Sequence, residues 1–382
     1  MAGTDFRHQM HVFGANQAGF ERSKLLFARF HIDLPLLLLL VVLCTAGLLV
    51  LYSASGQDLV MVQKQAIHYL IGFILLLVAA QIPPRVYQIL APWAYVIGVL
   101  ALIGVLVLGV SGKGAQRWLA IPGLPRFQPS ELMKLALPLS IAWYMTTKGS
   151  PPKLFTLAKA VVLIAIPLVL ILKQPDLGTS ILIGASGLLV LFFAGIPWWL
   201  IFSMISIVAA CAPLMWFFVM HSYQKQRVLT FLNPESDPLG SGWNIIQSKT
   251  AIGSGGIEGK GWMQGTQSQL EFLPESHTDF IIAVLAEELG LIGVLLLLTL
   301  YFLIIIRGLY MAARCTLIFN RLLSGSLIIT FFIYVFVNIG MVSGLLPVVG
   351  VPLPLVSWGG TSVVSLLAAF GVMMSMYTHD VK

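Results

Sequence analysis

Long apolar runs separated by short polar segments occupy most of this 382-residue chain. Each run is close to the ~20 residues that an α-helix needs to cross the hydrocarbon core of a bilayer. Backbone polar groups in lipid must be satisfied internally, which predicts that the runs are helices. We predict ten membrane spans, near residues 34–53, 66–82, 88–110, 131–147, 154–172, 179–195, 197–219, 279–306, 322–345 and 355–377.

One interval, residues 220–278, breaks this pattern because it is long and polar and leads directly into an apolar run. We predict that it is a single large loop between the seventh and eighth spans. The loop and the helix after it hold eight of the fifteen carboxylates: Glu235, Asp237, Glu258, Glu271, Glu275, Asp279, Glu287 and Glu288. A concentration of acids in so apolar a chain favours a functional site here.

The distribution of Lys and Arg predicts the orientation of the chain. With segment 1–33 in the cytoplasm, the short inner segments hold eleven basic residues and the short outer segments hold five. The positive-inside rule then places both termini in the cytoplasm and the 220–278 loop outside. The predicted fold class is an all-α polytopic membrane protein, with residues 1–382 forming one membrane domain.

Composition excludes several other classes of protein. A mean hydropathy of +0.93 and 58% apolar residues are too high for a soluble globular protein. The net charge of +7 does not indicate nucleic-acid binding, because the basic residues are spread between apolar runs. Cys44, Cys211 and Cys315 lack the paired spacing of a disulfide framework or a zinc site.

Ionisable residues at membrane depth are costly and are usually functional or paired. Glu131 and Lys134 are three residues apart, which places them on one face of the fourth helix. Ser130 is the predicted N-cap of that helix. Two interpretations stay open: a structural ion pair at the helix start, or part of a binding site.

Three further positions carry candidate chemistry, each with a simpler alternative. Asp176 lies on the outer side and either caps the sixth helix or takes part in a site. Arg227, at the membrane end of the long loop, is either a headgroup anchor or a phosphate clamp. Segment 111–130, which contains Arg117, holds three of the five outward basic residues and is suited to an anionic ligand or to lipid headgroups.

Asp279 stands where the long loop becomes the eighth helix. A carboxylate in the first helical turn is stabilised in its ionised form, which suits a base or a metal ligand, although ordinary capping is the alternative. Glu287 and Glu288 lie about 12 Å deeper along the helix, and we expect them to be buried partners of basic side chains. The glycine-rich run 253–261 does not fit a Walker phosphate loop, so we expect a flexible re-entrant or surface loop whose backbone comes close to a ligand.

An ordered set of motifs covers the chain after about residue 30. The motifs are 114–119 (GAQRWL), 127–132 (FQPSEL) with Lys134, 174–178 (QPDLG), 226–228 (QRV), 269–274 (QLEFLP), 277–280 (HTDF), 287–290 (EELG), 338–341 (NIGM), 344–352 (GLLPVVGVP) and 357–362 (SWGGTS). Together they resemble the shape, elongation, division and sporulation (SEDS) family of bacterial cell-wall polymerases. Segments 259–268 and 274–277 are similar to the member of that family that acts in rod-shaped elongation.

The resemblance implies a ten-span glycosyltransferase of the bacterial cytoplasmic (inner) membrane that polymerises lipid II on the periplasmic side. It implies that Asp279 is the essential loop aspartate. It also implies that the polar cavity is formed by Trp118, Glu131, Lys134, Asp176 and Arg227. The expected partners are a class B penicillin-binding protein, which is a transpeptidase, and other proteins of the elongation complex.

The chemistry expected of such an enzyme is one inverting displacement of a polyprenyl diphosphate. Asp279 would act as the base for the acceptor hydroxyl, while Lys134, Arg227 and Arg117 would stabilise the leaving group. A variant has a divalent cation, Mg²⁺ or Mn²⁺, held by Asp279 and the diphosphate. The alternatives are a flippase or transporter of lipid-linked precursors and a non-catalytic scaffold of the wall-synthesis complex.

Overall fold

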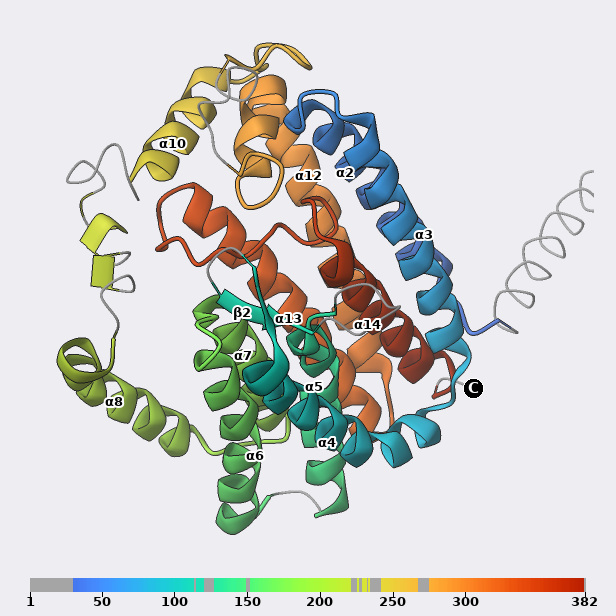
Figure 1. Ribbon diagram of the computed structural model, residues 1–382. Coiled ribbons are helices and arrows are strands. Elements are labelled where there is room, and N and C mark those ends of the chain that lie inside the picture. Colours follow the sequence, from blue (N-terminus) through green and yellow to red (C-terminus); the bar gives the residue numbers. More distant parts are fainter. Residues whose placement is uncertain are drawn as a thin grey trace, which may run out of the picture.

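The structure is a computed structural model that describes residues 30–112, 115–119, 127–148, 152–220, 225–226, 229–231, 233, 242–266 and 275–380. It is a bundle of helices with one small hairpin (Figure 1). The long helices are α2 (Leu34–Ala54), α3 (Leu59–Gln81), α4 (Pro84–Leu108), α5 (Pro129–Thr147), α6 (Leu154–Leu172), α7 (Leu177–Phe193), α8 (Trp198–Leu214), α10 (Trp243–Gly255), α12 (Ile281–Arg314), α13 (Ile318–Val342) and α14 (Gly360–Thr378). A five-residue π-helical segment, Met215–Val219, continues α8.

Every predicted span coincides with one of these helices, but not every helix is both long enough and apolar enough to cross a membrane. Among the described residues, seven are long and apolar enough: α2, α3, α4, α6, α12, α13 and α14. Of the other three predicted spans, α7 and α8 have 17 residues each, and α5 carries two charges near its start. Ten crossings therefore remain a prediction.

Capping residues explain where several helices begin. Asp33 accepts a hydrogen bond from Leu36 N at the start of α2, and Asp58 accepts from Val60 N and Met61 N at the start of α3. These carboxylates satisfy amides that have no partner within the helix. Pro129 opens α5, where its missing N–H costs nothing.

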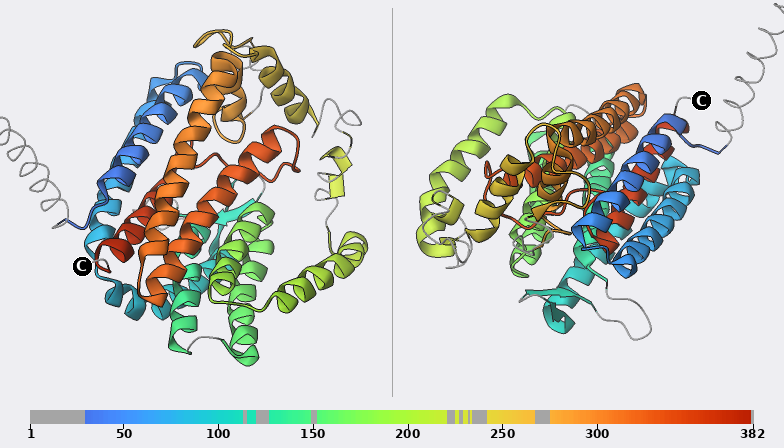
Figure 2. Two further views of the ribbon diagram at one scale, coloured as in Figure 1. Left: turned by 180° about the vertical axis from the view of Figure 1, so that it is seen from behind. Right: turned by 90° about the horizontal axis from the view of Figure 1, so that it is seen from above.

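Figure 2 shows the helix bundle from behind and from above. Two large hydrophobic cores hold it together. One core joins α2, α3, α12 and α14 and includes Leu40, Leu76 and Tyr301. The other joins α4, α5, α6 and α7 and includes Met133 and Leu137. Helices α13 and α14 supply residues to both cores, so they form the seam between the two halves.

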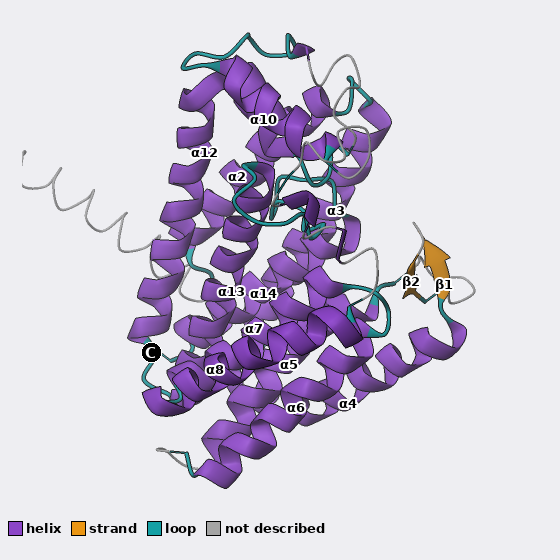
Figure 3. Cartoon of the chain, turned by 90° about the vertical axis from the view of Figure 1, so that its left-hand side faces the viewer, coloured by secondary structure: helices purple, strands orange, loops and turns teal. Residues whose placement is uncertain are grey.

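A β-hairpin interrupts the predicted all-α pattern. Strands β1 (Val110–Gly112) and β2 (Ala115–Trp118) pair in antiparallel fashion. Leu119 and Phe127 form a separate antiparallel β-bridge. Figure 3 shows the hairpin projecting from the end of α4. Strands of three and four residues are too short for an alternating pattern to reveal them. The hairpin carries two of the candidate site residues.

The interval 220–278 was expected to be a loop, but it contains helix α10, which packs against α12 and α13. The glycine-rich run 253–261 was expected to be a re-entrant or surface loop, but its first residues, Gly253 to Gly255, belong to the end of α10. Gly255 lies so close to α12 that a Cβ there would be 2.0 Å from Ala286 O. The close backbone approach is therefore to a helix of the same chain.

Helix α12 has a break at Gly290, where φ is 62° and ψ is −160°. The chain after α10 supplies the hydrogen bonds that the break removes. Leu291 N donates to Gly256 O at 3.0 Å, and Gly261 N donates to Glu288 O at 3.0 Å. A break in a transmembrane helix is tolerated where neighbouring groups satisfy the freed backbone in this way.

The predicted tight turn after the sixth span is confirmed, because α7 ends at Phe193 and α8 begins at Trp198. Gly195 adopts a φ of 89° in this turn. Beyond it, α8 runs away from the bundle (Figure 1). Its aromatic side chains Trp198, Trp199 and Phe202 are exposed, which suits a helix surrounded by lipid.

Candidate active site

A polar pocket of about 210 Å³ lies at the seam between the two cores. Its walls come from the hairpin, the starts of α5, α7 and α14, the middle of α13, and the loop before α14. Five residues singled out from the sequence line it: Arg117, Trp118, Glu131, Lys134 and Asp176. These positions span 60 residues of sequence, and the tertiary fold brings them into one site.

Glu131 and Lys134 form the predicted ion pair, with Lys134 Nζ 2.7 Å from Glu131 Oε1. The other carboxylate oxygen, Oε2, accepts a hydrogen bond of 2.7 Å from Ser365 Oγ of α14. Both charged side chains are largely buried, with 7% of Glu131 and 14% of Lys134 exposed. The prediction that Ser130 is the N-cap was wrong. Gln128 takes that position, because Pro129 already supplies the first helical residue.

Asp176 caps α7, as one of the two alternatives predicted, and it also lines the polar pocket. Its Oδ1 accepts from Thr179 N at 3.2 Å and caps α7, while its Oδ2 lies 3.5 Å from Arg117 Nη1. Arg117 also donates from Nη2 to Pro175 O at 2.7 Å, which holds the hairpin against the start of α7. The cap and the ion pair together fix one wall of the pocket.

Asp279 was expected in the first turn of a helix. In the structure it lies just before α12. The helix begins at Ile281, with Phe280 as its N-cap, and its start carries neither a first-turn acid nor a side-chain cap. The Asp279 carboxylate instead lies beside the loop before α14. Its Oδ2 is 3.6 Å from the point where a Cβ on Gly350 would stand, and Gly350 lines the polar pocket. Asp279 therefore borders the pocket from the α12 side.

Arg227, the remaining candidate, falls outside the described residues. Among the described residues that line the pocket, the ionisable groups balance, with Lys134 facing Glu131 and Arg117 facing Asp176. This arrangement differs from the simple cationic clamp expected for a diphosphate. Paired charges combined with the indole of Trp118 suit a neutral but strongly hydrogen-bonding group such as a sugar.

A polar stripe on α13 was missed at the sequence level. Thr330, Tyr334 and Asn338 recur every four residues, and all three are buried. The Tyr334 ring lies under Lys134, with Nζ 5.1 Å from the ring centroid, and Tyr334 lines the pocket. The spacing was visible in the sequence, since residues four apart share a helix face. The surrounding apolar run concealed it.

Glu287 is fully buried and is confirmed as the partner of a basic side chain. Its Oε1 lies 2.7 Å from Lys260 Nζ and accepts from Thr266 N at 2.8 Å. The neighbouring Glu288 accepts from Ser53 Oγ of α2 at 2.5 Å. These bonds hold the glycine-rich segment and α2 to the N-terminal part of α12.

The described residues contain no group of three or more His, Cys, Asp or Glu side chains that would hold a metal ion. If Asp279 binds a cation, the substrate phosphates and water must supply the other ligands. That pattern is usual for Mg²⁺ bound together with a phosphorylated substrate.

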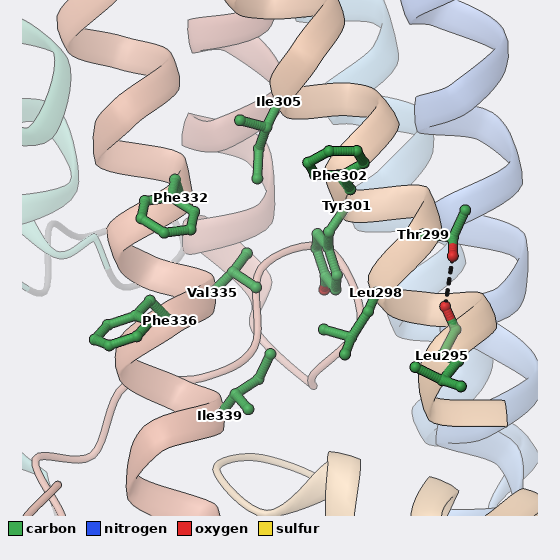
Figure 4. Close-up of a pocket in the computed structure, with 10 residues that line it drawn as sticks. All are labelled: Leu295, Leu298, Thr299, Tyr301, Phe302, Ile305, Phe332, Val335, Phe336 and Ile339. Atoms are coloured by element: carbon green, nitrogen blue, oxygen red, sulfur yellow. Dashed lines mark hydrogen bonds between the residues drawn. The ribbon is translucent and has the colours of Figure 1, made fainter. Parts of the chain in front are cut away.

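A second pocket, of about 490 Å³, opens between α12 and α13 (Figure 4). Phe302, Phe332 and Phe336 are among the side chains that line it, and the Thr299 hydroxyl bonds to Leu295 O at 2.7 Å within α12. It offers hardly any hydrogen-bonding groups to a sugar or a diphosphate. The polar pocket beside Asp279 is the better candidate for chemistry.

Comparisons with known proteins identify relatives that align with this chain over nearly its whole length. The chain is 55% identical over 357 residues to the peptidoglycan glycosyltransferase MrdB of Escherichia coli strain K12, which covers 94% of this chain and 96% of that protein. Among solved structures, a chain from a study of polymerisation and crosslinking by a peptidoglycan synthase complex has a TM-score of 0.80 and 31% identity, over 90% of this chain and 97% of that one. The rod shape determining protein RodA of Thermus thermophilus has a TM-score of 0.70 and 28% identity, over 92% of this chain and 98% of that one.

A family profile described as cell cycle protein, which groups FtsW, RodA and SpoVE, matches residues 32–382. The match covers nearly the whole chain and confirms the resemblance drawn from the ordered motifs. The chain belongs to the FtsW/RodA/SpoVE family of cell cycle proteins.

Proposed function

We propose that this chain is a peptidoglycan glycosyltransferase that polymerises lipid II into glycan strands at the outer face of the bacterial cytoplasmic membrane. The observation that carries the proposal is the position of the Asp279 carboxylate beside a polar pocket with balanced charges. Its relative MrdB bears the same activity in its name, and the two chains align over nearly their full lengths.

In this proposal, Asp279 removes the proton from the acceptor hydroxyl as that oxygen attacks the anomeric carbon of the donor sugar. The bond from that carbon to the polyprenyl diphosphate breaks on the opposite face, which inverts the configuration. A positioned general base contributes roughly 10²–10⁴-fold to the rate of such a step.

The pocket residues orient the sugars in this proposal. Glu131 and Asp176 offer carboxylate oxygens to sugar hydroxyls, and Trp118 offers an aromatic face. Lys134 and Arg117 contribute positive charge toward the diphosphate, but each is partly neutralised by its carboxylate partner. Arg227, which lies outside the described residues, stays a proposed ligand of the diphosphate beside them. A divalent cation bound by Asp279 and the diphosphate would add charge stabilisation there.

The family relationship also supports a role in cell elongation with a transpeptidase partner. A structural relative comes from a complex that coordinates polymerisation with crosslinking. We propose that this chain works beside a class B penicillin-binding protein in the elongation complex, so that new strands are crosslinked as they are made.

The proposal is tested by following glycan polymer from labelled lipid II with the wild type and Asp279→Asn, each with the transpeptidase present. The isosteric amide cannot accept a proton, so we expect the rate to fall at least ~10²-fold in a folded variant. Parallel reactions with added Mg²⁺, added Mn²⁺ or a chelator test the cation.

The result separates the alternatives. Equal polymer from wild type and variant would remove Asp279 from the chemistry. An intact complex that moves lipid II across vesicles but makes no polymer would identify a flippase instead. Full rate in chelator-stripped protein would exclude the cation variant of the mechanism.

A further inference from the structure

Asn338 of α13 connects the backbone of Asp279 to the wall of the polar pocket. Its Nδ2 donates to Asp279 O at 2.9 Å and to Val351 O at 2.7 Å. Val351 lines the pocket, next to the Gly350 that the Asp279 carboxylate approaches. One amide group, fully buried, therefore joins the start of α12 to the loop that borders the site.

Two neighbouring contacts hold the same turn. Ser357 Oγ donates to Thr278 O at 2.5 Å while it accepts from Leu353 N at 2.9 Å. Trp358 N donates to His277 O at 2.9 Å. With Asn338, these bonds engage three successive carbonyls, at positions 277, 278 and 279.

The turn that carries Asp279 precedes α12, which begins at Ile281, and it is closed by Thr278 N and Phe280 N, which both donate to Glu275 O. Its backbone position depends on partners supplied by α13 and by the loop before α14. A glycine at position 350, with a φ of 72°, allows the carboxylate to lie against that loop without a side chain between them. The backbone that carries the Asp279 carboxylate is in this way joined to the wall of the pocket.

We propose that Asn338 is a positioning residue for the proposed polymerase reaction, acting with Ser357 to hold the Asp279 carboxylate at the edge of the pocket. This inference rests on the proposed function, because it requires Asp279 to be the base. Reacting groups must be held within roughly 0.5 Å of the productive geometry. A misplacement of about 1 Å costs on the order of 10²-fold in rate.

The chain offers a matched control on the same helix. Asn320 is also fully buried, and its Nδ2 also has two acceptors, Met376 O and Asp380 Oδ2, both at 3.2 Å. It lies 18 residues earlier, roughly 27 Å away along α13 and far from the pocket. Replacing either Asn by Leu removes two donated hydrogen bonds, keeps the number of side-chain heavy atoms, and adds the same extra volume at both sites.

The experiment measures kcat and KM for lipid II polymerisation, together with the unfolding temperature, for the wild type, Asn338→Leu, Asn320→Leu and Asp279→Asn. We expect the two Leu variants to lose comparable stability. We expect only Asn338→Leu to lose kcat, by about 10–100-fold, with KM changed by less than about twofold. In the Asp279→Asn background, Asn338→Leu should cause no further loss, because the group that it positions is already gone.

Each result bears on one of the two proposals. A full rate for Asp279→Asn removes Asp279 as the base and the positioning role with it, whereas an intact complex whose wild type makes no polymer overturns the proposed function. An inactive Asp279→Asn with a normal kcat for Asn338→Leu, or an equal loss of kcat in both Leu variants, overturns the positioning role alone. If Asn338→Leu does not fold, Ser357→Ala is the deciding variant. A lowered kcat at unchanged KM supports the positioning role of Asn338 and Ser357, and a wild-type kcat overturns it.

Discussion

Glu131 and Lys134 show how one pair of residues can hold a site together and take part in it. Lys134 touches its partner carboxylate at 2.7 Å and lies over the ring of Tyr334. The second oxygen of Glu131 is bonded to Ser365, so the pair joins α5, α13 and α14. Removing one partner of a buried pair generally costs about 3–5 kcal/mol, whereas replacing both can be neutral.

This difference gives a prediction for the pair. Glu131→Gln and Lys134→Met should each lower the unfolding temperature, whereas the double variant should recover most of the loss, because no buried charge is left alone. If the pocket binds substrate, polymerisation should be lost in all three proteins. A double variant that is stable and fully active would show that the pair is only structural.

At the scale of elements, the N-terminal part of α12 depends on a segment from another part of the chain. The helix breaks at Gly290, and the segment after α10 enters the break. A Cβ at position 290 would stand 2.4 Å from both Ile257 O and Gly259 N, and the φ of 62° is itself unfavourable for other residues. Lys260 and Glu287 hold the same segment by their ion pair.

We therefore expect Gly290→Ala to lower the free energy of unfolding by at least about 1–3 kcal/mol, the usual cost of such a backbone conformation. The matched control is Gly104→Ala in α4, where an added Cβ meets nothing within 4 Å. That change should be neutral or stabilise the protein by up to roughly 1 kcal/mol. Thermal unfolding in detergent compares the two, and equal unfolding temperatures would show that the break carries no strain.

At the scale of the whole molecule, the seam between the two large cores determines where the polar pocket lies. Helices α13 and α14 belong to both cores, and the polar pocket opens along them. Because Asp279 comes from the α12 side and the other pocket residues come from α5, α7 and the hairpin, the site requires both halves. The proposed orientation places this seam toward the outer face of the membrane.

The orientation can be tested with single cysteines after Cys211, the exposed native cysteine, is changed to Ser. Gln57 between α2 and α3 and Lys148 after α5 are both exposed. A membrane-impermeant maleimide should label Gln57→Cys in intact spheroplasts, and Lys148→Cys only after permeabilisation. The reverse pattern would invert the predicted topology and place the pocket in the cytoplasm.

The positions of the long helices could be predicted from the sequence, because the backbone of an apolar run in lipid must satisfy its own hydrogen bonds and therefore forms a helix. Each of ten predicted ranges coincides with a helix, although α3 begins at Leu59 rather than near residue 66, and α12 continues to Arg314. Helix ends lie in polar or interfacial residues, where hydropathy gives little information. The hairpin and α10 were missed because short strands and a mildly apolar helix have no comparable signal.

For the site, the sequence determined which residue types were available, and the ordered motifs identified the family. The ion pair of Glu131 with Lys134 was also predictable, since it depends only on helical spacing. Tertiary structure alone decided that Asp176 meets Arg117, that Asp279 lies beside Gly350, and that Asn338 joins the two sides. These contacts join residues far apart in sequence, and their geometry depends on how the helices pack rather than on any local pattern.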